Sequence, residues 1–103
     1  MVIIWLPEAR EHLKDIYQFY KSNRSVNAAV KVREELYKAV APLKEHPKMA
    51  PVEIFSTKTT EKYHSLVVGK YFKIVYYISD EKIYISAIFD CRQNPKTNEN
   101  KLK

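Results

Sequence analysis

The stretch from Tyr71 to Ile78 constrains the fold most, because its eight residues are aromatic or β-branched except for one lysine. Such a composition is typical of a central β-strand. The chain's single glycine, Gly69, stands just before it. A two-residue loop at Gly69-Lys70 would make a hairpin there, because glycine adopts positive φ at little cost. The polar residues 79–82 predict a second turn, and Ile83 to Phe89 a third strand, so we expect a three-stranded antiparallel meander.

The two predicted turns also set the register of the meander. They place Val67 opposite Phe72 in the first hairpin and Ile74 opposite Ala87 in the second. Because side chains alternate between the faces of a sheet, one face would be almost wholly apolar and must be covered. This covered face would carry Val67, Phe72, Ile74, Tyr76, Ile78, Ile83, Ile85, Ala87 and Phe89. The opposite, open face would carry His64, Leu66, Lys73, Val75, Tyr77, Tyr84, Ile88, Asp90 and Arg92.

The first half of the chain predicts the elements that cover the apolar face. Residues 2–5 are typical of a short strand, and Pro7 suits the first turn of a helix. Ser25 is a good N-cap for a second helix, Pro42 should tighten the last turn of that helix, and Pro47 should end it. Apolar residues recur at helical spacing in two stripes: Ala9, Leu13, Ile16, Tyr17 and Tyr20, then Ala29, Val32, Leu36, Ala39, Val40 and Leu43.

These elements predict an α+β fold: strand, helix, helix and three-stranded meander. The sheet would be mostly antiparallel, with a helical hairpin packed on one face. The segment 48–62 is typical of a loop, with a short extended piece within 49–55.

Composition is that of a globular protein of one domain. The 103 residues, 46% hydrophobic and 29% charged, fit a single domain over 1–103, with a polar tail at 94–103 that we expect to be mobile. No apolar run approaches the roughly 20 residues that cross a bilayer, so we expect no membrane contact. The single cysteine, Cys91, excludes an internal disulfide, fits a cytoplasmic protein, and has the parity of the covered face. Cys91 and three scattered histidines give no zinc spacing, so we expect neither metal nor cofactor.

The formal net charge of +6 favours an anionic partner, either nucleic acid or an acidic protein segment. We expect such a partner on the open face, which would carry Lys73, His64 and Arg92, with Tyr77 and Tyr84 farther along the same surface. Cations interleaved with aromatic rings can hold phosphates and stack bases. The alternative is a basic, solvated outer face without a specific partner.

Two stretches of the chain resemble the RelE/ParE superfamily of bacterial toxins. One is YHSLVVGKYFKIVY at 63–76, and the other is IFDCRQNP at 88–95. The superfamily pattern has an aromatic–basic–aliphatic–aliphatic–tyrosine strand and a basic residue just past the last strand. The resemblance extends over nearly the whole chain, including WLPEA at 5–9. It implies the toxin of a type II toxin–antitoxin module, neutralised by a cognate antitoxin that is encoded beside it.

The resemblance leaves two functional classes open. One branch cleaves mRNA on the ribosome, which needs a base, cations for the phosphate and an acid for the leaving oxygen. Another branch inhibits DNA gyrase and is not a nuclease. Lys73 and Arg92 hold positions of the nuclease branch's cations, but His64 and Leu66 stand where lysines are usual, and Asn98 about where a tyrosine acid is usual.

Because only half of the nuclease branch's phosphate-binding cations are present and its acid is missing, the sequence favours a ParE-like inhibitor of DNA gyrase. The alternatives are a RelE-like, ribosome-dependent mRNA endoribonuclease and a non-toxic basic binding domain.

The same positions supply the predicted functional residues. Arg92 is expected to be the chief functional side chain, with Lys73 second and His64, which can act as a base near neutral pH, third. An antitoxin segment that folds on binding would cover cationic and apolar surface together. The predicted partner-binding residues are Leu66, Lys70, Val75, Tyr77, Tyr84, Ile88 and Asp90.

Overall fold

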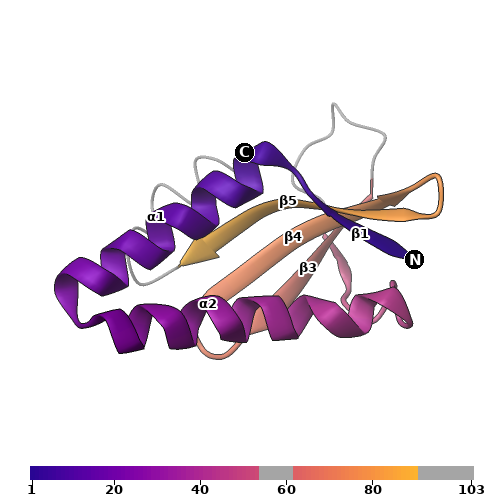
Figure 1. Ribbon diagram of the computed structural model, residues 1–103. Helices are drawn as coiled ribbons and strands as arrows, with labels where there is room; N and C mark the ends of the chain where they lie inside the picture. Colours follow the sequence, from indigo (N-terminus) through magenta and orange to yellow (C-terminus); the bar gives the residue numbers. More distant parts are fainter. Residues whose placement is uncertain (54–61, 91–103) are drawn as a thin grey trace.

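The computed structural model of the chain describes residues 1–53 and 62–90. Its strands are β1 (Val2–Trp5), β2 (Val52–Glu53), β3 (Tyr63–Val68), β4 (Phe72–Ser79) and β5 (Lys82–Asp90). Its helices are α1 (Pro7–Asn23) and α2 (Val26–Val40), followed by the short 3₁₀ helix η1 (Ala41–Lys44). Figure 1 shows the twisted meander of β3, β4 and β5 with the two helices lying along it. The order of the elements confirms the predicted α+β fold.

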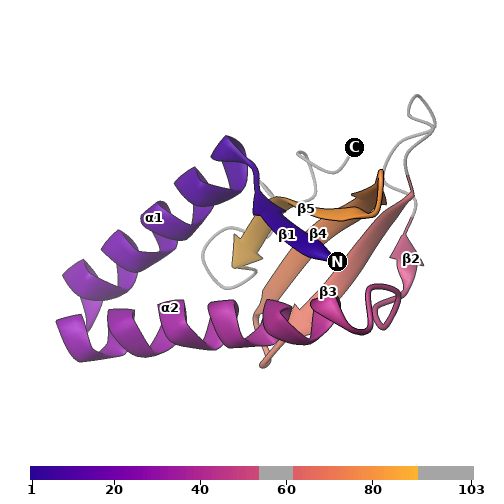
Figure 2. The ribbon, with the colours of Figure 1, turned by 45° about the vertical axis from the view of Figure 1, so that its right-hand side comes forward.

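The two helices lie on the same face of the sheet, as Figure 2 shows. α1 begins at Pro7, a position where the missing N–H breaks no helical hydrogen bond. α2 begins after Ser25, whose hydroxyl accepts a hydrogen bond from the Ala28 N–H at 3.0 Å, as an N-cap should. Pro42 lies in η1 and so tightens the chain after α2, as predicted. The buried residues of the two helices are Ala9, Leu13, Ile16, Tyr20, Ala29, Leu36 and Val40.

The strands form one sheet in the order β1-β5-β4-β3-β2. β1 runs parallel to β5, with Trp5 paired to Ile85, and the other strand pairs are antiparallel. β2 is the short extended piece expected within 49–55. β4 is the central strand, with hydrogen-bonded neighbours on both sides. The sheet residues buried in the main core are Val68, Phe72, Ile74, Tyr76, Ile83, Ile85 and Ile88.

The loop between β3 and β4 has three residues, where the sequence predicts two. Gly69 has a φ of 61°, so the predicted reason for glycine at this position is confirmed. The longer loop pairs Val68 with Phe72 and shifts β3 by one residue relative to β4. Such a shift moves every side chain of β3 to the other face. Val67, predicted for the covered face, is therefore 65% exposed.

A β-bulge between β4 and β5 produces a second difference from the predicted register. The predicted pairs Ile78–Ile83 and Tyr76–Ile85 are confirmed. Beyond them the register shifts by one, because Ser86 is an extra residue of β5 without a partner in the pairing. The pairs after the bulge are Val75–Ala87, Ile74–Ile88, Lys73–Phe89 and Phe72–Asp90. In the last part of β5, each side chain therefore lies on the face opposite to the one that was predicted for it.

Two polar side chains on the covered face fasten the chain that leads from η1 to β2. The Tyr76 hydroxyl donates a hydrogen bond to the Pro47 carbonyl at 2.8 Å, and His64 Nδ1 lies 2.8 Å from the Ala50 carbonyl oxygen. The two rings stack with their centroids 4.9 Å apart. Burial raises the pKa of Tyr76 from its ordinary value of 10.0, opposed in part by a hydrogen bond with the Ala50 backbone. The hydroxyl therefore stays protonated at neutral pH and remains a donor.

Replacing Tyr76 with phenylalanine should destabilise the protein by about 0.5–1.5 kcal/mol, because the Pro47 carbonyl loses its donor in a partly buried site. Urea unfolding measures this change in the free energy of unfolding. Tyr37→Phe is the matched control, because Tyr37 is 48% exposed and its hydroxyl has no such partner among the described residues. Equal midpoints for Tyr76→Phe and the unaltered protein would contradict the anchoring role.

Candidate functional site

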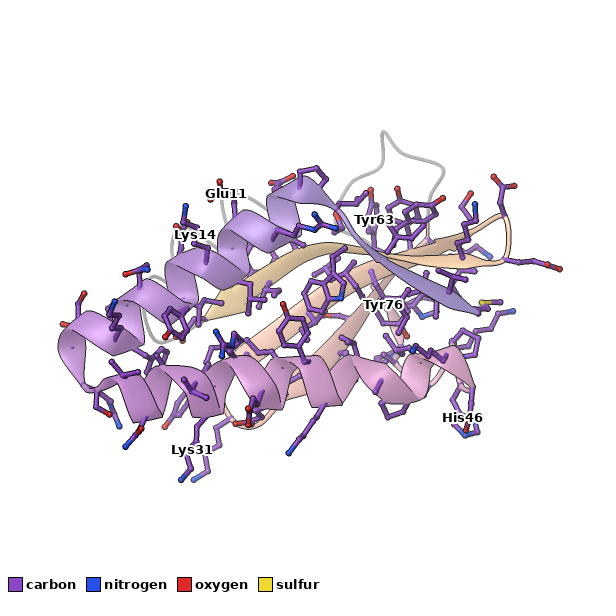
Figure 3. The ribbon with its side chains drawn as sticks, in the orientation of Figure 1. Glu11, Lys14, Lys31, His46, Tyr63 and Tyr76 are labelled. Carbon is purple, nitrogen blue, oxygen red and sulfur yellow. The ribbon has the colours of Figure 1, made fainter. Side chains whose placement is uncertain are left out.

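The open face, on the side of the sheet away from the helices, carries four of the predicted residues: Lys73, Val75, Tyr77 and Tyr84. Tyr63, Tyr77 and Tyr84 form a row of rings across β3, β4 and β5, with successive centroids 5.5 and 5.1 Å apart. Ala87 and Phe89, predicted for the covered face, form a second buried cluster here with Val75. Figure 3 labels Tyr63, which packs against this second cluster, and Tyr76, which lies in the main core beneath the helices.

His64, Leu66, Ile88 and Asp90 lie on the covered face, so their predicted placement on the open face is wrong. The three-residue loop turns His64 and Leu66 toward the helices, and the β-bulge does the same for Ile88 and Asp90. His64 is only 6% exposed, and it projects to the side of the sheet opposite Lys73. The predicted positions Arg92 and Asn98, and Cys91 with its predicted burial, lie outside the described residues.

α1 holds the end of β5, which sequence reasoning did not anticipate. β1 stops pairing with β5 at Ile85, and farther along β5 the Ile88 N–H donates a hydrogen bond to His12 Nδ1 at 3.2 Å. Two helical turns later, the Tyr20 hydroxyl donates to Asp90 Oδ2 at 3.1 Å. The only sequence signal was the spacing of four that places His12 in the buried stripe of Ile16 and Tyr20.

His12 acts here as a neutral acceptor. A ring nitrogen that accepts a hydrogen bond carries no proton, so Nε2 is the protonated nitrogen. Nε2 lies 3.9 Å from a carboxylate oxygen of Glu8, one helical turn earlier, which is beyond hydrogen-bond distance. The His12 ring also lies against that of Phe89, with centroids 5.9 Å apart. The contacts of His12 and Tyr20 therefore hold the end of β5 against α1.

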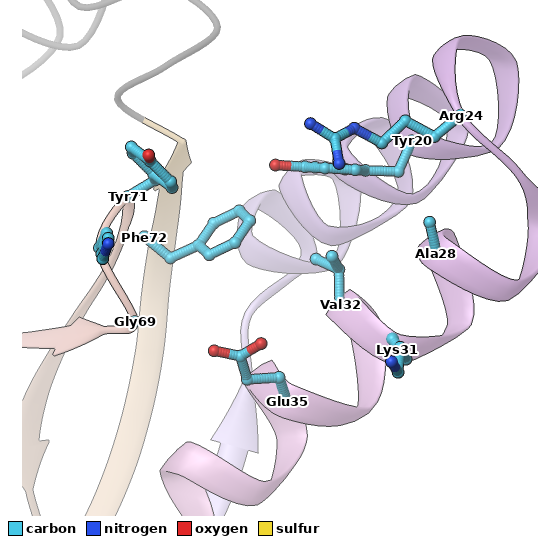
Figure 4. A pocket seen from close by; sticks show the side chains of 10 residues that line it. Tyr20, Arg24, Ala28, Lys31, Val32, Glu35, Gly69, Tyr71 and Phe72 are labelled. Carbon is cyan, nitrogen blue, oxygen red and sulfur yellow. The ribbon is translucent and has the colours of Figure 1, made fainter.

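A groove opens where the β3–β4 loop faces the start of α2 (Figure 4). Its volume is about 300 Å³, and its floor is formed by Tyr20 and Phe72, whose ring centroids are 6.2 Å apart. Its rim carries Arg24 from the end of α1, Lys31 from α2 and Lys70 from the loop. Lys70, a predicted partner-binding residue, thus belongs to this groove and not to the open face.

The rim of the groove is cationic and exposed. Within residues 1–53 and 62–90, no carboxylate lies within 4.0 Å of the charged groups of Arg24, Lys31 or Lys70. The described residues contain no group of three or more His, Cys, Asp or Glu side chains able to hold a metal ion. No helix in these two ranges is long and apolar enough to cross a membrane. The groove can therefore offer both positive charge and apolar contact to an anionic partner.

Comparison with protein families gives a match over nearly the whole fold. Residues 3–95 match the family described as the ParE toxin of the type II toxin–antitoxin system parDE. The chain belongs to the ParE toxin family. As a type II toxin it has a cognate antitoxin as its partner, as the superfamily resemblance implied. A search of curated proteins gives no match to the sequence.

Two solved structures share the fold of this toxin. One, described as the chromosomal ParDE TA system from P. aeruginosa, has a TM-score of 0.73 at 19% identity and covers 87% of this chain and 95% of its own. The other, described as the YoeB dimer from Staphylococcus aureus, has a TM-score of 0.55 at 18% identity, with coverages of 86% and 94%. At such identities the likeness concerns the fold.

Replacing His12 with leucine should loosen the end of β5, because the Ile88 N–H then has no acceptor where β1 has ended. Hydrogen exchange measured by NMR should be about tenfold faster or more at the Ile88 amide, and unchanged at Ile83, which pairs with β1. His12→Asn is the matched control, since its side-chain oxygen can take the place of Nδ1. Equal protection at Ile88 in His12→Leu and the unaltered toxin would contradict this role.

Proposed function

We propose that this ParE-family toxin stops growth by inhibiting DNA gyrase and is neutralised by its antitoxin. The observation that supports the proposal is the ParE family match over residues 3–95, because the sequence pattern also favours a ParE-like toxin. Gyrase as the target is what we propose. Membership of a toxin–antitoxin module follows from the family match.

The positions of the cations support a target other than mRNA. Cutting RNA by attack of its 2′-hydroxyl needs a base, an acid and several cations gathered around one phosphate. Leu66, at one of the positions where the nuclease branch has lysine, brings no charge. His64, at the other, lies beneath the helices with Nδ1 held at the Ala50 carbonyl, on the side of the sheet away from Lys73. The described residues therefore do not gather the predicted base beside the predicted cation.

The functional surface that we propose is the open face, with Lys73 as its principal cation among the described residues. Arg92, the chief functional residue predicted from the sequence, lies outside those residues. Lys73 pairs with Phe89 in the sheet and is partly exposed beside the buried cluster of Val75 and Ala87. The aromatic row of Tyr63, Tyr77 and Tyr84 continues the same face and gives it an apolar contact area. His64, the third functional residue predicted from the sequence, is buried. It is therefore better suited to holding the segment before β2 than to contacting a target.

A gyrase supercoiling assay tests the positive half of the proposal. The purified toxin should inhibit supercoiling of relaxed plasmid in a dose-dependent way, and an equimolar amount of antitoxin should restore the activity. Primer extension on mRNA after induction of the toxin should show no cuts at the ribosomal A site. Ribosome-dependent cuts together with full gyrase activity at every dose would overturn the proposal in favour of the nuclease alternative.

Alanine substitution tests the two proposed cations. Loss of a charge-assisted contact costs about 1.5–3 kcal/mol, so Arg92→Ala should weaken inhibition by roughly ten- to a hundredfold, with Lys73→Ala next in effect. Lys82→Ala is the control, because Lys82 is exposed at the β4–β5 turn. It lies at the opposite end of β5 from Phe89, the strand partner of Lys73. Thermal melting checks folding in each case. A folded Arg92→Ala toxin with full potency would show that this side chain does not carry the function.

A further inference from the structure

We infer that the groove between the β3–β4 loop and the start of α2 binds an acidic segment of the antitoxin that inserts one large apolar side chain. The inference rests on the antitoxin partnership of the proposed function and assigns it a second surface, separate from the open face. Three features of the groove carry it: an apolar floor, a cationic rim without an ion-pair partner among the described residues, and one well-placed carboxylate.

The floor of the groove is suited to an apolar anchor. Tyr20 and Phe72 are 3% and 6% exposed and form its base, while Val32 and the 40%-exposed Tyr71 form its sides. Figure 4 shows Phe72 pointing from the strand toward the helices, beneath Tyr20 and Arg24. A volume of about 300 Å³ is small for a whole ligand but sufficient for one or two large side chains. Such a depression is what an anchoring residue of a peptide fills.

The rim of the groove is complementary to acidic side chains. Arg24, Lys31 and Lys70 come from three different elements, are exposed, and have no ion-pair partner in the part of the chain that the structure describes. Ala28 lines the groove in the first turn of α2, so the positive end of this helix adds to the same potential. An acidic segment would therefore be attracted from solution and held on both sides of its apolar residue.

Glu35 distinguishes a peptide from a nucleic acid as the occupant. Its carboxylate faces the β3–β4 loop in Figure 4, where Glu35 Oε1 lies only 3.0 Å from the place a Cβ on Gly69 would take. A phosphate entering the groove would meet this negative charge and be repelled. A peptide can instead donate a backbone N–H to the carboxylate while its acidic side chains pair with the rim. The mixed charge of the groove therefore favours a protein segment.

Charge reversal on the rim is the central test, with the affinity of the toxin for its purified antitoxin as the readout. The double variant Arg24→Glu/Lys70→Glu should bind at least about tenfold more weakly. Lys14→Glu/Lys38→Glu, which changes the net charge equally on exposed helix positions outside the groove, should bind within about twofold of the unaltered toxin. Ala28→Gln fills the groove without changing charge and should also weaken binding by about tenfold, because the apolar anchor is excluded. Thermal melting confirms that each variant is folded.

The contrary outcomes separate this inference from the proposed function. Undiminished antitoxin binding by the folded Arg24→Glu/Lys70→Glu and Ala28→Gln variants overturns the groove assignment, while gyrase inhibition is measured independently. An equal loss in Lys14→Glu/Lys38→Glu also overturns it, because net charge alone would explain the result. Binding of a single-stranded or duplex oligonucleotide that is strengthened by Glu35→Gln and lost with the rim charges would replace the peptide with nucleic acid.

Discussion

Burial of β4 on both of its faces is the constraint on which the rest of the structure depends. Ile74 and Tyr76 are 0% exposed beneath the helices, and Val75 is 3% exposed on the other side. A backbone enclosed in this way needs hydrogen-bonding strands at both edges, which β3 and β5 supply. β1 then completes the outer edge of β5, and α1 takes over at His12 where β1 ends. The helical hairpin is held in place because it has this apolar surface to cover.

The elements could be predicted from the sequence, whereas the pairing between them could not. Helical stripes, the cap at Ser25 and the strand composition of 71–78 are local signals, and the structure agrees with them. Alternation of apolar and polar residues specifies the register of a strand well only when a single face of the sheet is apolar. Val75, Ala87 and Phe89 make the second face apolar too, so the pattern did not exclude a shift of one residue. Loop length at Gly69 and the bulge at Ser86 then decided the register.

The same two shifts explain what could be predicted of the candidate site. Lys73, Tyr77 and Tyr84 were placed correctly because they lie on β4 or on β5 before the bulge. His64 and Asp90 were misplaced because they lie beyond a shift, and each became a buried residue with a hydrogen-bond partner. The groove was not predictable, since it gathers Arg24, Lys31 and Lys70 from elements that meet only in the folded chain. Contacts of this kind carry no periodic signal in a single sequence.

We propose that the open face of this toxin binds gyrase and not the ribosome. The most direct measurement places a photo-crosslinking amino acid at position 73, on the open face, or at position 64, beneath the helices, and irradiates the toxin with purified gyrase and ribosomes together. We expect adducts with a gyrase subunit from position 73 and none from position 64. Adducts of position 73 with the ribosome alone would contradict gyrase as the target.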